Sequence, residues 1–173
     1  NYSPRSNLDG LASIPEKIIC TGPPTMQQLA DFSMPTNRMT IGGAFRYPAC
    51  ADLAFAPNAP VFVALPFDPI VAAEMVAVVK SIEGRRFLVK DHPMTPFEFD
   101  ETPAVRRTDI PLIAQDSVSS VVYAATTVGL EAVILGLPTL RFRPAERIAL
   151  DILPAGISVP AVDCRGFNQA LAT

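Results

Sequence analysis

Two short polar segments, each directly after an apolar run, carry residue types that bind phosphate groups. One is Thr126-Thr127, where "SSVVYAA" gives way to "TTVGLEAVILG". The N–H groups of a first helical turn lack partners within the helix, and a helix N-terminus carries about half a positive charge. Two hydroxyls there add donors, so the pair predicts a phosphate-binding corner. An ordinary helix cap by Thr126 is the alternative interpretation, and a cap oxygen can yield to a ligand.

Two further residues of this segment, Gly129 and Glu131, fit the same hypothesis. A glycine weakens the first turn of a helix, so its presence there calls for a structural or functional explanation. Close approach of a ligand or of another backbone would explain the glycine, and a tight helix–strand contact explains it equally well. Glu131 can accept hydrogen bonds from ribose hydroxyls, as acidic residues do in other α/β nucleotide sites. A solvated glutamate, or one bonded to a nearby N–H, is the alternative.

The second polar segment, "VKDHPM", holds the only histidine of the chain, His92. Pro93 favours an extended backbone at His92 and would stiffen its placement. An imidazole there can hydrogen-bond a base, a ribose or a phosphate, and Lys90 stands two residues before it. A surface histidine, or one that bridges loops, is the alternative interpretation.

The elements that must position these residues form a regular pattern from residue 60 onward. Buried strands are predicted at 60–66, 85–93, 119–125 and 138–142, and helices at 68–84 and 126–136. Weaker patterns predict a short strand at 110–115, a last strand at 156–162 and a helix starting at 167, with 94–109 irregular. Strands that alternate with helices of about ten residues form parallel βαβ units with right-handed crossovers. The sequence therefore predicts a doubly wound, Rossmann-like α/β sheet with helices on both faces, and such sheets bind ligands outside the carboxyl ends of their strands.

The first 59 residues have a different organisation. They predict a short strand at 17–22, a helix at 23–33 and a strand within 37–48 that ends at Gly42-Gly43. Residues 45–59 lack periodicity and contain two prolines, which is typical of a linker. We therefore expect residues 1–59 to be an inter-domain segment and residues 60–173 to be the nucleotide-binding domain.

Composition narrows the classes of function. The net charge of −3 argues against a nucleic-acid binder held by phosphate contacts. The three cysteines have no metal-ligand spacing, and no apolar run reaches the roughly 20 residues of a membrane span. The polar start lacks the core of a signal peptide, so a cytoplasmic location is expected. The chain begins without methionine and stops inside a helical pattern, so we expect it to be part of a longer protein.

The two polar segments together resemble a group of bacterial glycosyltransferases with the GT-B fold. "KDHP", followed about thirty residues later by "AATTVGLEAVILGLPTLRF", is similar to the His-Pro and Ser/Thr motifs of sialyl- and Kdo-transferases and of CDP-glycerol glycerophosphotransferases, which build capsule, lipopolysaccharide and related polymers. His92-Pro93 match the first motif, and Thr126-Thr127 occupy the second in place of Ser-Ser. Residues 15–47 resemble the segment that joins the two GT-B halves.

The resemblance implies that the chain is the C-terminal, donor-binding half of a metal-independent transferase for surface polysaccharide. The donor would be a CMP-, CDP- or UDP-linked sugar, and the acceptor domain would precede this chain, so the fragment alone would turn over little. The full protein could lie at the inner membrane. His92 would act on the leaving nucleotide, and positive groups would neutralise its phosphate. The implied nucleotide- or phosphate-binding residues are Thr126, Thr127, Gly129, Glu131, Lys90, Pro93, Gly43 and Arg46.

Two other functions remain open from the sequence. A nucleotide-sugar enzyme of the 2-epimerase type shares the GT-B architecture, although its phosphate helix usually begins with a Ser-Gly-Gly type turn, from which "TTVGLEA" departs. A non-catalytic, Rossmann-like interaction module is the other alternative. For Gly43 and Arg46, a tight turn and a solvated cation are the plainer interpretation.

Overall fold

The computed structural model describes residues 15–43, 53–145, 147–154 and 156–171. The chain divides into two compact units, Asn1–Pro48 and Ala49–Thr173, and each is described by itself. Arg46 and most of the expected linker lie outside the described residues.

The first unit is the expected strand–helix–strand. Strand β1 (Ile18–Cys20) pairs in parallel with β2 (Met39–Ile41), and helix α1 (Pro23–Asp31) lies between them in the chain. Two prolines begin α1, where their missing N–H groups cost nothing. A 3₁₀ turn, η2 (Thr36–Arg38), leads into β2. The small core consists of Cys20, Met34 and Met39, with Met26, Leu29 and neighbouring side chains packed against it.

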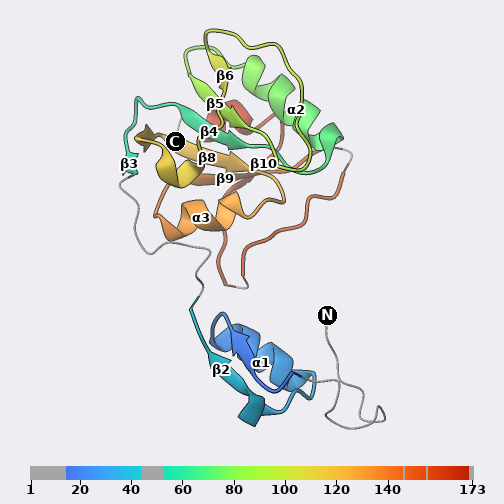
Figure 1. Cartoon of the computed structure of the whole chain (residues 1–173). Coiled ribbons are helices and arrows are strands. Elements are labelled where there is room, and N and C mark those ends of the chain that lie inside the picture. The colour runs from blue at the N-terminus through green and yellow to red at the C-terminus, as the bar shows by residue number, and fades with distance from the viewer. Residues whose placement is uncertain (1–14, 44–52, 146, 155, 172–173) are drawn as a thin grey trace. The chain divides into compact units, whose positions relative to one another are not determined.

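The second unit is built on a six-stranded, entirely parallel sheet (Figure 1). In spatial order the strands are β10 (Ala161–Val162), β9 (Thr139–Phe142), β8 (Ser120–Tyr123), β4 (Val61–Ala64), β5 (Phe87–Lys90) and β6 (Val105–Arg107). Two shorter strands, β3 (Ala54–Phe55) and β7 (Ser117–Val118), pair with each other. From β4 the chain proceeds outward to β6, then returns to β8 and proceeds outward the other way. The order therefore reverses between β4 and β8, and in open α/β sheets ligands bind outside the strands' carboxyl ends at such a reversal.

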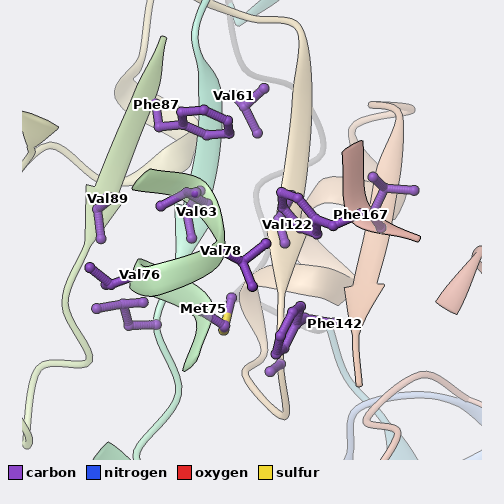
Figure 2. Packing of buried hydrophobic residues seen from close by; sticks show 14 of the residues in the cluster. Val61, Val63, Met75, Val76, Val78, Phe87, Val89, Val122, Phe142 and Phe167 are labelled. Atoms are coloured by element: carbon purple, nitrogen blue, oxygen red, sulfur yellow. The ribbon is translucent and has the colours of Figure 1, made fainter. Parts of the chain in front are cut away.

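Helices cover both faces of this sheet, which confirms the predicted doubly wound, Rossmann-like α/β fold. Helix α2 (Pro69–Lys80) and the short α4 (Phe167–Ala170) pack on one face, and α3 (Val128–Ile134) packs on the other. Alternate residues of each buried strand serve the two faces: Val63 contributes to the α2 side and Phe62 to the α3 side. Figure 2 shows part of the α2 side, where valines, Met75 and Phe142 interdigitate. Asp68 caps α2 by accepting a hydrogen bond from the N–H of Ile70 at 2.9 Å.

Two predictions of local structure were wrong. The segment 110–115, expected as a strand, contains the 3₁₀ helix η3 (Leu112–Ala114) after Pro111, and only Leu112 of that helix is buried. The segment 94–109, expected to be irregular, contains strand β6 at the sheet edge. Its sequence, "VRR", has no apolar alternation because an edge strand needs little burial. Pairing with β5 makes it a strand.

Candidate functional site

The two polar corners lie at the same edge of the sheet. β4 has β5 on one side and β8 on the other, and its Ala64 is in register with both Lys90 and Tyr123. Because all three strands are parallel, the residues after each strand emerge at the carboxyl edge. His92 follows β5 and Thr126 follows β8, so the two corners are separated by a single strand.

One small pocket joins the two corners. It has a volume of about 100 Å³, and five of the predicted residues line it: Lys90, His92, Pro93, Thr126 and Glu131. Apolar residues from β4 and η3 form its floor, among them Phe62 and Leu112. The pocket therefore offers a cation, an imidazole and a hydroxyl as hydrogen-bond donors, with a carboxylate as an acceptor.

The ring of His92 is oriented by its own loop. The N–H of Met94 donates to Nδ1 at 3.3 Å, and the N–H of Thr95 donates to the carbonyl oxygen of His92 at 3.0 Å. The Phe67 ring meets the imidazole edge-on, with 5.5 Å between centroids. Since Nδ1 accepts a hydrogen bond, the neutral ring carries its proton on Nε2. That N–H is the group with which His92 can donate to an anion.

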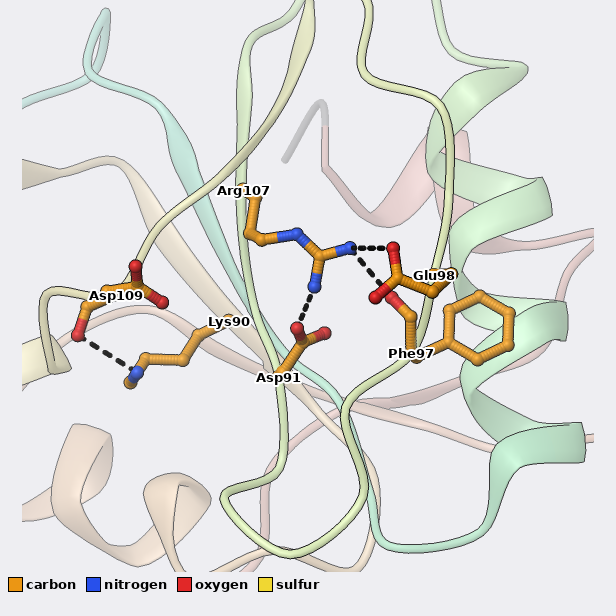
Figure 3. Close-up of polar contacts among 6 residues, drawn as sticks. All are labelled: Lys90, Asp91, Phe97, Glu98, Arg107 and Asp109. Carbon is orange, nitrogen blue, oxygen red and sulfur yellow. Dashed lines mark hydrogen bonds and ion pairs between the residues drawn. The ribbon is translucent and has the colours of Figure 1, made fainter.

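The structure adds Asp91 and Arg107, neither of which was predicted to belong to the site (Figure 3). Asp91 lines the pocket and forms an ion pair with Arg107 of β6. Lys90 donates from Nζ to the carbonyl oxygen of Asp109 at 3.0 Å. The position of Asp91 between Lys90 and His92 was a signal that the sequence offered. The sequence offered no signal for Arg107, because only the pairing of β5 with β6 brings Arg107 close to Asp91.

The Thr-Thr corner has one unusual backbone conformation. Ala125 has φ 47°, in the left-handed region, and it turns the chain from β8 toward α3. The hydroxyl of Thr126 accepts from the N–H of Val128 at 3.4 Å, so Thr126 supplies a long capping contact and also lines the pocket. Thr127 occupies the N-cap position, is exposed and does not line the pocket.

Ala125→Gly tests whether this corner stores strain. An L-residue in the left-handed region costs about 1–2 kcal/mol, and glycine avoids this cost. Glycine also raises the conformational entropy of the unfolded chain, which offsets part of the stabilisation. We expect the variant to be more stable by about 0.5 kcal/mol in urea unfolding. The Ala125 side chain is exposed, so its removal leaves no cavity. A clear loss of stability would mean that the methyl group packs and the turn is unstrained.

Gly129 is explained by packing. A Cβ at this position would lie 2.5 Å from ring atoms of Tyr123, whose side chain is completely buried. Burial raises the pKa of Tyr123 to about 12. The sequence left two explanations for Gly129, close approach of a ligand and a tight contact between helix and strand. Gly129 does not line the pocket, and the structure shows the tight contact.

No protein-family model, curated protein or solved structure matches this chain. Within the described ranges, no group of three or more His, Cys, Asp or Glu side chains is arranged to hold a metal ion. Among the same residues, no helix is long and apolar enough to cross a membrane.

The remaining predicted residues lie elsewhere. Gly43 follows β2 in the first unit and is exposed, and Arg46 lies outside the described residues.

Two larger pockets lie at the opposite, amino edge of the sheet. Their volumes are about 490 and 350 Å³, and both are lined by Pro57, Arg85 and Ser119. The larger is walled by the first residues of β8 and β9, and among the described residues of its lining only Arg85 is charged. We favour the carboxyl edge as the functional site because four kinds of polar group converge there, at the reversal of strand order.

Proposed function

We propose that the second unit binds the nucleotide of a nucleotide-sugar donor, as the donor-binding part of a bacterial glycosyltransferase for surface polysaccharide. One observation carries this proposal. Lys90, His92 and Thr126, which come from two different strand ends, line one pocket beside the point where the strand order reverses. These three donors suit an anionic ligand at that place, and the charge of Asp91, which also lines the pocket, is paired with Arg107.

The chemistry of the lining assigns a role to each side chain. The Lys90 ammonium, the Nε2–H of His92 and the hydroxyl of Thr126 would donate to phosphate oxygens, and Glu131 would accept from ribose hydroxyls. A volume of about 100 Å³ is well below that of pockets that enclose a drug-sized ligand. The phosphate would therefore occupy the pocket, with the base outside it against Phe67, which is 59% exposed.

The reaction of the whole protein would be a displacement at the sugar carbon. The acceptor hydroxyl attacks that carbon, the bond to the donor phosphate breaks, and the nucleotide leaves with the bonding electron pair. His92 and Lys90 would stabilise the negative charge that grows on the leaving phosphate. We propose that the acceptor site and the base that takes the acceptor's proton belong to another part of the full-length protein.

Thermal unfolding with CMP, CDP, UDP and GDP tests the proposal. A ligand that binds only the folded state stabilises it by RT ln(1 + [L]/Kd), or about 2.7 kcal/mol at a hundredfold excess over Kd. We expect the cytidine nucleotides to raise Tm. His92→Ala should remove this shift with little change in the ligand-free Tm, because the ring is only half-buried.

Two adjacent threonines provide a matched pair for the same assay. Thr126→Ala should weaken the nucleotide-induced shift more than Thr127→Ala, since only Thr126 lines the pocket. Unchanged Tm with all four nucleotides would contradict the proposal and favour an interaction module. A response to UDP alone would favour an epimerase or a general GT-B transferase. Loss of the fold in His92→Ala would mean that His92 is structural.

A further inference from the structure

A single guanidinium, that of Arg107, contacts residues on both sides of His92 in the chain. Its Nη1 forms the ion pair with Asp91, at the start of the loop, and its Nη2 donates to the carbonyl oxygen of Phe97 at 2.9 Å (Figure 3). The carboxylate of Glu98 lies 3.7 Å from Nη2. The planar fork of arginine allows two such bonds at once, which an ammonium group could not reproduce.

Arg107 is itself held in place. It is the last residue of β6, and its Cα is in register with Val89 of β5. The guanidinium carbon lies 4.8 Å from the centre of the Phe99 ring, a cation–π contact. The side chains of Arg107 and Asp91 are only 24% and 19% exposed, so solvent screens their attraction less than that of a surface pair.

His92 lies in the chain between Asp91 and Phe97, the two residues that Arg107 holds. Within the loop, His92 and Thr95 form an antiparallel bridge, and the Met94 N–H orients the ring through Nδ1. Without Arg107, the Asp91 carboxylate would be left charged in a place where its Oδ1 is buried and has no partner among the described residues. A buried, uncompensated charge is costly, so Asp91 would turn toward water and displace its neighbour His92.

We infer that Arg107 is a positioning residue, which fixes the His92-Pro93 corner in the geometry of the pocket through Asp91 and the Phe97 carbonyl. This inference rests on the proposed function for its ligand readout. Arg107 does not line the pocket, so the inference gives the edge strand β6, which carries Arg107, an indirect role in the pocket. The geometry of the loop in the ligand-free protein provides a separate readout.

Because His92 is the only histidine, the imidazole C–H protons give a single pair of NMR signals. In Arg107→Gln we expect these signals to move and the Met94 amide to exchange with solvent about tenfold faster, as for the loss of one charge-assisted hydrogen bond. Arg106→Gln is the matched control, since Arg106 is the exposed neighbour in the same strand. It should change neither observation.

The ligand arm of the experiment measures Kd for CMP. Arg107→Gln should weaken binding about tenfold, and Asp91→Asn should do nearly the same. The double variant should be no worse than Arg107→Gln alone, because that change already breaks the contact that Asp91→Asn breaks. Asp91→Asn alone carries the test if Arg107→Gln does not fold.

The two proposals fail in different ways. If the unmodified protein binds none of the four nucleotides but Arg107→Gln still moves the His92 signals, the positioning role is supported and the proposed function is contradicted. If Arg107→Gln keeps the His92 signals, the Met94 exchange rate and the Kd of the unmodified protein, the positioning role is overturned. If the losses of Arg107→Gln and Asp91→Asn add in full, Arg107 does not act through Asp91, which also overturns it.

Discussion

Gly129→Ala is expected to lower the free energy of unfolding by about 3 kcal/mol, the upper end of the usual cost of overpacking a core. The added methyl would lie 2.5–2.6 Å from three atoms of the Tyr123 ring. That ring is completely buried between β8 and α3, so it has no open space into which it can move. Alanine favours a helix by about 1 kcal/mol over glycine, which offsets only part of the cost. Urea unfolding measures the difference.

A double-mutant cycle identifies the ring as the cause. In the Tyr123→Leu background, Gly129→Ala should cost at least about 1 kcal/mol less than in the unmodified protein, because residues in direct contact couple by this order. Equal costs in the two backgrounds would show that the glycine is needed for something other than the ring. A stable variant with impaired nucleotide binding would restore the ligand interpretation of Gly129.

Phe142→Ala is expected to cost about 4 kcal/mol, the range found for truncation of a buried phenylalanine. Phe142 is the last residue of β9, is fully buried, and meets Phe167 of α4 edge-on with 6.1 Å between ring centroids. Helix α4 has four residues, so its stability depends on this packing. Amide exchange in α4 should therefore accelerate more than amide exchange in α3, which packs on the other face.

Phe67→Ala is the matched control for this truncation. Phe67 is 59% exposed, so the same chemical change should cost less than about 0.5 kcal/mol. Equal losses of stability for the two phenylalanines would contradict the assignment of Phe142 to the core. Uniform acceleration of exchange in α3 and α4 would show that α4 does not depend on Phe142 in particular.

The parallel sheet and its helices were predictable because the two central strands, β4 and β8, are almost entirely apolar. "VFVA" and "SVVY" serve both faces of the sheet, so their sequences identify them without knowledge of their partners. The start of α2 was predictable from Asp68 and Pro69, whose cap and first-turn roles are local. Strand β6 was missed because a three-residue edge strand has no comparable apolar signal.

The candidate site was predictable in part. The rule that ligands bind beyond the carboxyl ends of parallel strands placed His92 and Thr126 at one edge, where the structure also has them. Which of the two threonines lines the pocket depends on the backbone of a single turn, with Ala125 in the left-handed region. That conformation is not encoded in the residue types of the segment.

Local chemistry in the chain was enough to specify the fold class and the two corners, because caps, prolines and apolar runs act over a few neighbours. The packing of one element against another could not be predicted from the sequence. The ring that occupies the space beside Gly129 comes from the preceding strand, and the guanidinium that holds Asp91 comes from the edge of the sheet. Both follow from how elements stack and pair, and such packing appears only once the chain is folded.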